Sequence, residues 1–338
     1  MTAPILDLAH VSKTFAPRLT LGDKIAARLG GDVETRSVRA VREVSLSLAK
    51  GETLGLVGES GCGKSTLGRI AAGIMRPDAG AVRLDGAPMM SPSGTKLTTR
   101  VQTVFQDPFA SLNPRIKIGE TIAEGPIAHG LVARAKARAY VAEWLDLVGL
   151  DPSFSERYPH QFSGGQRQRV AIARALAMRP DVIVCDEPVA SLDVSIQAQI
   201  VNLLLKLRRE LDLTYLFISH DLGVVRHISD RVAIMYLGRI VELGDAVALY
   251  ETPQHPYTQA LLASVPRLVT DENERADFTP IAGEIPSPLA PPPGCPFHTR
   301  CPHAGPRCIE EVPPLVEGSA LRPTACHLYT GGVGRIAA

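Results

Sequence analysis

Eight consecutive residues near the start of the chain have the spacing of a phosphate-binding loop. They fit the pattern G-x-x-x-x-G-K-[ST] without a mismatch and run Gly58-Glu59-Ser60-Gly61-Cys62-Gly63-Lys64-Ser65. Glycines in such a loop let successive backbone N–H groups surround phosphate oxygens, and the following helix N-terminus adds its positive dipole end. Lys64 would reach the β- and γ-phosphates, and the Ser65 hydroxyl would bind Mg²⁺. Together with Thr66, the loop predicts a nucleotide site.

A second motif supplies two adjacent carboxylates. Asp186 and Glu187 directly follow the apolar run 182–185. This is the Walker B arrangement, in which Asp186 would support Mg²⁺ and Glu187 would polarise the water that attacks the γ-phosphate. An acidic pair is weak evidence alone, because it can simply be a solvated strand end. At about 120 residues after a phosphate-binding loop, it predicts hydrolysis of a nucleoside triphosphate.

A third motif lies between these two. Ser163 precedes Gly164, Gly165 and Gln166 at the start of a run with helical composition. A serine cap followed by glycines makes a second helix N-terminus that could bind phosphate. An ordinary serine-capped helix is the alternative interpretation.

The elements that must position these motifs follow from the apolar runs. We expect strands at 5–8, 44–48, 53–57, 82–84, 102–105, 182–185, 215–219, 231–235 and 239–242. We expect helices at 64–74 and 195–211, and a helix-rich segment that extends to about residue 178. In that segment Val141, Trp144, Leu145 and Val148 form one apolar helical face, which we interpret as core packing. The pattern predicts an α/β body with a helical insert. The insertion at 16–38 suggests no function.

Composition limits the class of protein. The length of 338 residues suggests roughly two domains. Lys and Arg total 36 against 35 Asp and Glu, so charge gives no reason to expect nucleic acid or an anionic bilayer as the main partner. No apolar run approaches the ~18 residues of a membrane span, and residues 1–10 lack the layout of a secretory signal. We therefore expect a cytoplasmic chain, which would have to dock on separate membrane subunits if it serves a membrane process.

The segment FSGGQRQR at 162–169 resembles the signature of ABC-type ATPases. The resemblance implies a P-loop NTPase fold, with a RecA-like α/β core, an antiparallel β subdomain and a helical subdomain over about 107–178. It implies that ATP and Mg²⁺ bind at the phosphate loop. It also implies that Ser163 and Gly165 contact the nucleotide held by the opposite subunit, so that the ATPase works as a head-to-tail dimer.

Further motifs of this family occur in order along the chain. Gln106 resembles the Q-loop glutamine, Asp193 in Ser191-Leu192-Asp193 resembles the D-loop, and His220 resembles the switch histidine that contacts the γ-phosphate. Phe15 resembles the aromatic residue that stacks on adenine, and a core phenylalanine is the alternative. The resemblance implies a catalytic set of Glu187, His220, Gln106 and Lys64, and Mg²⁺ ligands from Ser65, Gln106 and Asp186.

The C-terminal part narrows the family. The segment ETPQHPYTQALL at 251–262, the segment SLNP at 111–114 and the cysteine-bearing tail look like ATP-binding subunits of oligopeptide, dipeptide and nickel importers. We expect two parts in the chain, an ABC ATPase nucleotide-binding domain at 1–250 and an extension at 251–338. The extension holds 15 of the 27 prolines. The resemblance implies a peripheral subunit at the cytoplasmic face of the inner membrane. It would pair with a sister ATPase, favoured to be a paralogue, beneath two permeases that receive solute from a binding protein.

Four of the six cysteines lie in the proline-rich extension, at Cys295, Cys301, Cys308 and Cys326. The gaps of five, six and seventeen residues argue against zinc, which usually takes sulfurs from closely spaced pairs. Disulfides conflict with a reducing cytoplasm, whereas an iron–sulfur cluster tolerates irregular spacing. Similar tails in some peptide-importer ATPases hold a [4Fe–4S] cluster, which we expect here with a structural or sensing role. Zinc, helped by neighbouring histidines, and unligated thiols are the alternatives. We interpret Cys62 and Cys185 as packing residues.

These patterns predict an ATP-hydrolysing subunit of an ABC importer for peptides or related small solutes. One alternative is an ABC-type ATPase that acts on DNA or ribosomes. Such proteins typically carry a long coiled coil or two cassettes in one chain, and this sequence has neither. Another alternative is a nucleotide-regulated metal-cluster sensor, against which the intact Glu187 and His220 argue.

Overall fold

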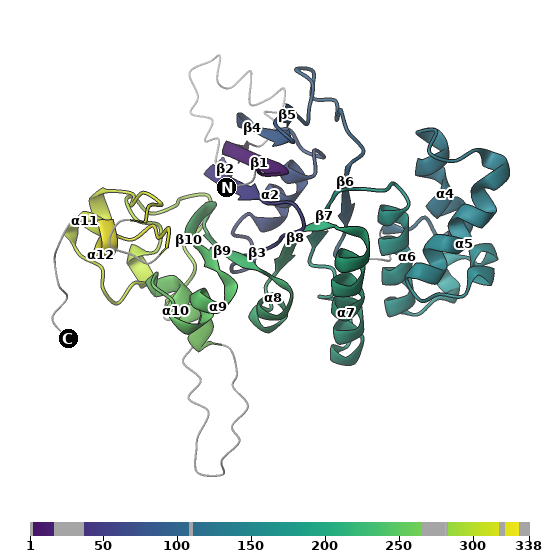
Figure 1. Cartoon of the computed structure of the whole chain (residues 1–338). Helices are drawn as coiled ribbons and strands as arrows, with labels where there is room; N and C mark the ends of the chain where they lie inside the picture. The colour runs from purple at the N-terminus through teal and green to yellow at the C-terminus, as the bar shows by residue number, and fades with distance from the viewer. Residues whose placement is uncertain are drawn as a thin grey trace, which may run out of the picture.

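The structure is a computed structural model that describes residues 3–16, 37–107, 111–264, 281, 283–317 and 322–330. Almost all of the insertion predicted at 16–38 lies outside the described residues. Figure 1 shows an α/β body with an antiparallel sheet on one side, a group of helices at one end and the C-terminal segments at the other.

A six-stranded sheet forms the centre of the body. Its strand order is β10 (Arg239–Asp245), β9 (Arg231–Tyr236), β3 (Thr53–Val57), β8 (Thr214–Ser219), β7 (Val182–Asp186) and β6 (Val101–Val104). The strands from β9 to β6 run parallel, and β10 pairs antiparallel with β9. Strands β3, β7 and β8 are buried at every position. Continuous apolar runs therefore identified them in the sequence, since both faces of the sheet are covered.

The second sheet is antiparallel and four-stranded, in the order β2 (Val38–Leu48), β1 (Leu6–Phe15), β4 (Ala79–Leu84) and β5 (Ala87–Pro88). Its inner face packs on α2 (Lys64–Ala71), which places Leu6, Leu67 and Ile70 in one buried cluster. Strands β1 and β2 are longer than the predicted ranges 5–8 and 44–48. Register shifts between Leu8 and Thr14 break the alternation of polar and apolar residues, so the apolar runs covered only part of each strand.

The helical insert contains α4 (Ile118–Ala128), α5 (Ala137–Leu147) and α6 (Gly164–Leu176), joined by the short turns η1 (Arg134–Lys136), η2 (Pro152–Glu156) and η3 (Pro159–Gln161). The predicted apolar face is confirmed, because Val141, Leu145 and Val148 are buried and Trp144 packs against the same cluster. Helix α7 (Val194–Leu211) begins one residue before its predicted start. Helix α2 ends at Ala71 rather than Ile74, because Gly73 takes the left-handed conformation that terminates helices.

The extension packs onto the body rather than standing apart from it. Helix α8 (Leu222–Ile228) precedes β9, and α9 (Ala246–Glu251) contains residue 250, the predicted domain boundary. After it come α10 (Pro256–Ala263), η4 (His298–Arg300), α11 (Pro306–Glu310) and α12 (His327–Thr330). Tyr257 and Phe297 belong to the same buried cluster as the sheet residue Tyr215. Among the described helices, none combines the length and the apolar character that a membrane crossing requires.

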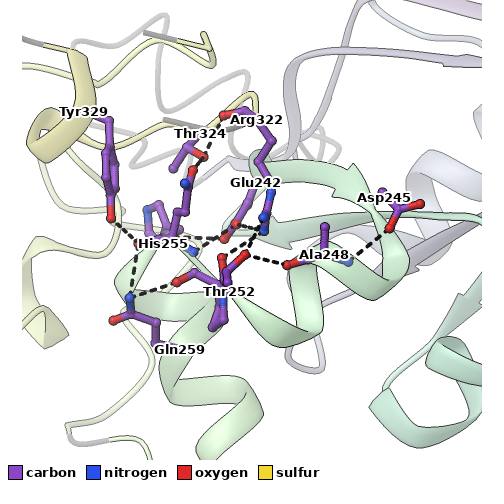
Figure 2. Close-up of polar contacts among 11 residues, drawn as sticks. Glu242, Asp245, Ala248, Thr252, His255, Gln259, Arg322, Thr324 and Tyr329 are labelled. Carbon is purple, nitrogen blue, oxygen red and sulfur yellow. Dashed lines mark hydrogen bonds and ion pairs between the residues drawn. The ribbon is translucent and has the colours of Figure 1, made fainter. Parts of the chain in front are cut away.

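A buried carboxylate ties the extension to β10. Figure 2 shows Glu242 inside a polar network whose members come from both parts of the chain. Its oxygens accept hydrogen bonds from the N–H groups of Gln254 at 3.0 Å and His255 at 2.9 Å, and from Arg322 Nη1 at 3.2 Å. Arg322 also donates to the carbonyl and hydroxyl oxygens of Thr252. Glu242 and Arg322 are both buried. A buried charge without a partner costs free energy, so each of these two charges stabilises the other.

Two backbone hydrogen bonds beside this ion pair continue the sheet into the extension. The N–H of Leu243 donates to the carbonyl of Pro323 at 3.0 Å, and the N–H of Ala325 donates to the carbonyl of Val241 at 2.8 Å. The last described segment therefore pairs with the outer edge of β10. An edge strand without such a neighbour leaves a row of backbone N–H and C=O groups unpaired.

His255 predicts a pH dependence for the stability of this junction. The side chain is fully buried, its Nδ1 accepts a hydrogen bond from the N–H of Tyr257 at 3.0 Å, and burial lowers its pKa from 6.5 to about 3. As pH falls below 6.5 the unfolded chain binds a proton that the folded chain does not, so stability is lost progressively until about pH 3. Between pH 7 and pH 5 this loss amounts to about 2 kcal/mol. It is measured as the pH dependence of Tm.

The variant His255→Asn should show a shallower fall in Tm between pH 7 and pH 5, because asparagine caps a helix without titrating. His227→Asn on α8 is the matched control, because His227 is exposed, and its curve should follow that of the unmodified chain. Parallel curves for all three proteins would contradict this assignment.

Candidate active site

The phosphate loop joins β3 to α2, as predicted, and close approach to neighbouring strands explains two of its glycines. A Cβ on Gly58 would lie 2.1 Å from the carbonyl oxygen of Met235 at β9. A Cβ on Gly63 would lie 2.0 Å from the carbonyl oxygen of Ala40 on β2, and Gly63 also has a φ of 109°. Only glycine fits either position without displacing backbone. The loop is therefore pressed between the two sheets.

Lys64 and Ser65 follow the loop at the start of α2. The Lys64 side chain is buried, and its Nζ donates hydrogen bonds to the carbonyl oxygens of Gly58 at 2.7 Å and Glu59 at 3.0 Å. The ammonium group thus lies within the loop. The hydroxyl of Ser65 donates to Asp186 Oδ1 at 2.9 Å. Ser60 and Gly61 are exposed at the tip of the loop, where backbone N–H groups can face a ligand.

Asp186 is the last residue of β7, and its carboxylate lies beside the helix that the phosphate loop starts. Burial raises the pKa of Asp186, whereas the hydrogen bond from Ser65 and the nearby Arg69 act in the opposite direction. A buried carboxylate next to a hydroxyl offers the hard oxygen ligands that Mg²⁺ prefers. These two residues therefore fit a Mg²⁺ ion held together with nucleotide phosphates.

Glu187 has a backbone conformation that is unusual for a residue with a side chain. Its φ is 49°, in the left-handed region, and its N–H donates to the carbonyl of Ile218 at 2.9 Å. Such strain persists where surrounding contacts fix it, and it concentrates at active sites. The side chain reaches His220 at the end of β8, with 3.3 Å between Glu187 Oε2 and His220 Nδ1. The ends of two neighbouring strands thus bring a carboxylate and an imidazole together.

Gln106 and the 191–193 segment meet at the same edge of the sheet. Gln106 lies two residues after β6, and its carbonyl oxygen accepts a hydrogen bond from the Ser191 hydroxyl at 3.4 Å. Asp193 is exposed and precedes α7. Phe15 is the last residue of β1, and 42% of its surface is exposed. The alternative interpretation of Phe15 as a core phenylalanine is therefore wrong.

Ser163 caps α6 in a reciprocal arrangement with Gln166. The Ser163 hydroxyl accepts from the N–H of Gln166 at 3.3 Å, and the Gln166 side chain accepts from the N–H of Ser163 at 3.0 Å. A Cβ on Gly165 would lie 2.6 Å from Ile196 Cγ2 on α7, so this glycine lets the two helices approach closely. Figure 1 draws α6 away from α2, with β8 and β7 between them. The helix that begins after Ser163 therefore lies apart from α2, which follows the phosphate loop of the same chain.

The cysteines of the extension share one region. The N–H of Cys295 donates to the carbonyl of Cys308 at 2.8 Å. Burial raises the pKa of Cys326 to about 12, and the thiols of Cys295, Cys301 and Cys308 are near enough to add to that shift.

The arrangement of these thiols does not support the predicted [4Fe–4S] cluster or its zinc alternative. Within the described ranges, no three His, Cys, Asp or Glu side chains are arranged to hold a metal ion. The sequence placed four thiols in one region of the extension, as the structure shows, and the cluster itself stays a prediction. Cys62 and Cys185 are buried free thiols, in agreement with their interpretation as packing residues.

The sequence did not reveal that the extension reaches the phosphate loop. Arg300 donates to both carboxylate oxygens of Glu59, at 2.8 and 3.1 Å, and the N–H of Glu59 donates to the hydroxyl of Tyr257 at 2.9 Å. Glu59 and Arg300 are 241 positions apart. No local spacing signals such a pair.

Comparisons with known proteins agree with this geometry. The family described as "ABC transporter" matches residues 41–190, and "Oligopeptide/dipeptide transporter, C-terminal region" matches residues 241–308. The "Oligopeptide transport ATP-binding protein AppF" of Bacillus subtilis (strain 168) is 51% identical over 330 residues, covering 96% of this chain and 98% of that protein. The "Oligopeptide transport ATP-binding protein OppF" of Escherichia coli (strain K12) is 50% identical over 296 residues, covering 86% of this chain and 88% of that protein.

Two solved structures share the fold. The cbiO1 protein from Clostridium perfringens, part of the ABC transporter complex cbiONQ, has a TM-score of 0.60 and 28% identity, and the match covers 74% of this chain and 92% of that chain. The ATP-binding cassette MJ0796, in a dimeric post-hydrolysis state bound to ADP and Pi, has a TM-score of 0.59 and 28% identity, with 71% and 98% of the two chains covered.

Proposed function

The chain belongs to the ABC transporter family, and on that basis we propose that it is the ATP-hydrolysing subunit of an importer for peptides. It has the P-loop NTPase fold and is an ATPase coupled to transport. Relatives named as oligopeptide transport ATP-binding proteins, about half identical over most of the chain, support peptides as the solute. Nothing in these relatives favours an ATPase that acts on DNA or ribosomes, or a metal-cluster sensor.

One observation carries the mechanism: the phosphate loop, Asp186, Glu187 and His220 meet at the carboxyl ends of neighbouring parallel strands. Ser65 and Asp186, with Gln106, would hold Mg²⁺, which when bound neutralises charge on the β- and γ-phosphates. Lys64 would exchange its two carbonyl partners for phosphate oxygens.

Glu187 would accept the proton of the water that attacks the γ-phosphate, as a general base does. His220 would hold the Glu187 carboxylate in place, and its exposed ring is free to contact the γ-phosphate. Phe15 would stack on the adenine, because its ring is exposed at the end of β1.

The second half of each site would come from another ATPase subunit. Ser163, Gly164, Gly165 and Gln166 lie at the start of a helix that β7 and β8 separate from α2 in Figure 1, so they suit a nucleotide held by a partner in a head-to-tail dimer. Asp193 would link the two sites. Beside it Val194 is 81% exposed, a degree of exposure that suits a residue covered in an interface.

We further propose the assembly around this dimer. The partner is a paralogous ATPase, and the pair lies beneath two permeases at the cytoplasmic face of the inner membrane, where a solute-binding protein delivers the peptide. In this proposal residues 1–250 form the nucleotide-binding domain, with its helical subdomain at about 107–178, and residues 251–338 form the extension.

Glu187→Gln should separate ATP binding from hydrolysis. The amide cannot accept a proton from water, so phosphate release should fall at least about 100-fold. The Kd for MgATP should stay near that of the unmodified chain, and a closed dimer should accumulate in MgATP. Full hydrolysis by the variant would show that Glu187 is not the general base.

Lys64→Ala should instead weaken MgATP binding at least about tenfold, because it removes the cation within the loop. Lys50→Ala is the matched control, since it removes the same charge from an exposed ion pair with Asp212. The assignment of Lys64 to the phosphates fails if both lysine variants bind MgATP as tightly as the unmodified chain.

The transport assignment is tested on the chain purified from mildly solubilised membranes. Two permeases, a second ATPase and a solute-binding protein should co-purify. The reconstituted complex should take up labelled peptides in an ATP-dependent manner, and the complex that carries Glu187→Gln should not. Uptake of nickel chelates without peptides would contradict the peptide assignment. Ribosomal or DNA-associated partners without membrane proteins would contradict transport itself.

The cluster expected from the sequence makes a prediction about composition. If Cys295, Cys301, Cys308 and Cys326 hold a [4Fe–4S] cluster, anaerobically purified chain contains about four iron and four acid-labile sulfide atoms and absorbs visible light. Cys301→Ser should remove most of this iron, whereas Cys62→Ser in the body should not. Stoichiometric zinc, or no metal in the unmodified chain, would contradict the expectation.

A further inference from the structure

Glu59 is the second residue of the phosphate loop, and its N–H, its carbonyl and its carboxylate all form hydrogen bonds. Its N–H donates to the Tyr257 hydroxyl at 2.9 Å, and its carbonyl accepts from Lys64 Nζ at 3.0 Å. Its carboxylate accepts from Arg300 Nη1 at 2.8 Å and from Arg300 Nη2 at 3.1 Å. Tyr257 lies on α10 and Arg300 on η4, so two segments of the extension fix the conformation of the loop.

Both extension residues are themselves fixed by packing. The rings of Tyr236, Tyr257 and Phe297 pack against one another with centres 4.6 to 5.3 Å apart. Tyr236 is the last residue of β9, which lies next to the strand that leads into the loop. The guanidinium of Arg300 lies 5.9 Å from the ring centres of Tyr236 and Phe297, and 3% of the Arg300 side chain is exposed. A side chain held this way transmits its position to its partner.

Arg300 stays charged although it is buried, because it has hydrogen-bond partners. Burial opposes the charge, but hydrogen bonds to Glu59 and Tyr236 outweigh it and hold the pKa of Arg300 above its ordinary value. Arg300 is therefore a permanent cation against a loop carboxylate, in the bidentate geometry that makes such pairs strong.

A carboxylate in a phosphate-binding loop disfavours the binding of phosphate, because both groups are negatively charged. The negative charge of Glu59 would repel a nucleotide triphosphate bound a few residues away, and repulsion between charges at short range is large where water is excluded. Arg300 neutralises this charge and draws the carboxylate toward the extension. The cost of an acidic loop residue is thus removed by a residue from the far end of the sequence.

We propose that the C-terminal extension positions the phosphate loop through Arg300 and Tyr257, so that the affinity of this chain for MgATP depends on the docked extension. Arg300 and Tyr257 act through Glu59 and are positioning residues. The proposal rests on the proposed ATP binding at this loop and adds a positioning contact to it.

A single and a double variant of the full chain test the ion pair. Arg300→Ala leaves the Glu59 carboxylate unpaired beside the phosphates, so the Kd for MgATP should rise about tenfold. The Kd for MgADP should rise less, because ADP carries less charge. Adding Glu59→Gln to Arg300→Ala removes the unpaired charge and should return the Kd for MgATP to within about threefold of the unmodified chain.

Two milder variants keep the test informative if Arg300→Ala does not fold. Tyr257→Phe retains the buried ring and removes the hydroxyl that accepts from Glu59, so it should raise the Kd for MgATP about threefold with little change in Tm. Arg300→Lys keeps the charge without the bidentate geometry and should fall between Arg300→Ala and the unmodified chain. Arg307→Ala is the control, because it removes an exposed cation of the extension that pairs with Glu311 instead.

The outcomes distinguish this proposal from the function on which it rests. Unchanged MgATP affinity in Arg300→Ala, or in both milder variants, overturns the positioning role, while weakened binding in Lys64→Ala keeps the nucleotide site. A double variant as weak as Arg300→Ala would attribute the loss to packing alone and would also overturn the role of the ion pair. An unmodified chain that binds no MgATP refutes both proposals.

Discussion

The register between β3, β8 and β7 is the constraint on which the chemistry of this chain depends. Val57 pairs with Ser219 and Asp186 pairs with Ile218, so the phosphate loop, the carboxylates and His220 all leave the sheet at the same level. Because successive side chains of a strand point to opposite faces, a slip of one residue would turn Asp186 away from α2. Because both faces of these strands are buried, such a slip would also exchange the side chains that pack on the two faces of the sheet.

Close backbone approach fixes the loop as firmly as the register fixes the strands. The loop lies between the carbonyl groups of Met235 and Ala40, which leave no room for a Cβ at Gly58 or Gly63. The antiparallel sheet and the central sheet therefore both set its path. The extension adds a third contact at Glu59, so the loop depends on three parts of the fold that are distant in sequence.

The sequence predicted the parts of this fold that local residues determine. The loop, Asp186 with Glu187, and the buried strands are contiguous patterns whose chemistry or burial is visible over a few residues. The full lengths of β1 and β2 were missed because shifted register breaks their alternation. The pairs Glu59–Arg300 and Glu242–Arg322 were missed because partners 241 and 80 positions apart meet only after the extension has packed. The cysteine spacing predicted four thiols in one region, which the structure shows, whereas the metal cluster stays a prediction.

The two ends of the molecule act on different parts of the site. At one end the helical insert lies next to β6, whose carboxyl end leads to Gln106 and its contact with Ser191. At the other end the extension contacts β10 through Glu242 and the phosphate loop through Glu59. Gln106 is therefore bound at the edge of the sheet beside the helical insert, whereas Glu59 at the start of the loop is bound to the extension. In the proposed dimer the start of α6 would face the nucleotide of the partner, whereas the contacts of Glu59 with Tyr257 and Arg300 lie within one chain. In this proposal the extension would set how tightly the loop binds phosphate, while closure of the dimer would set when the phosphate is hydrolysed.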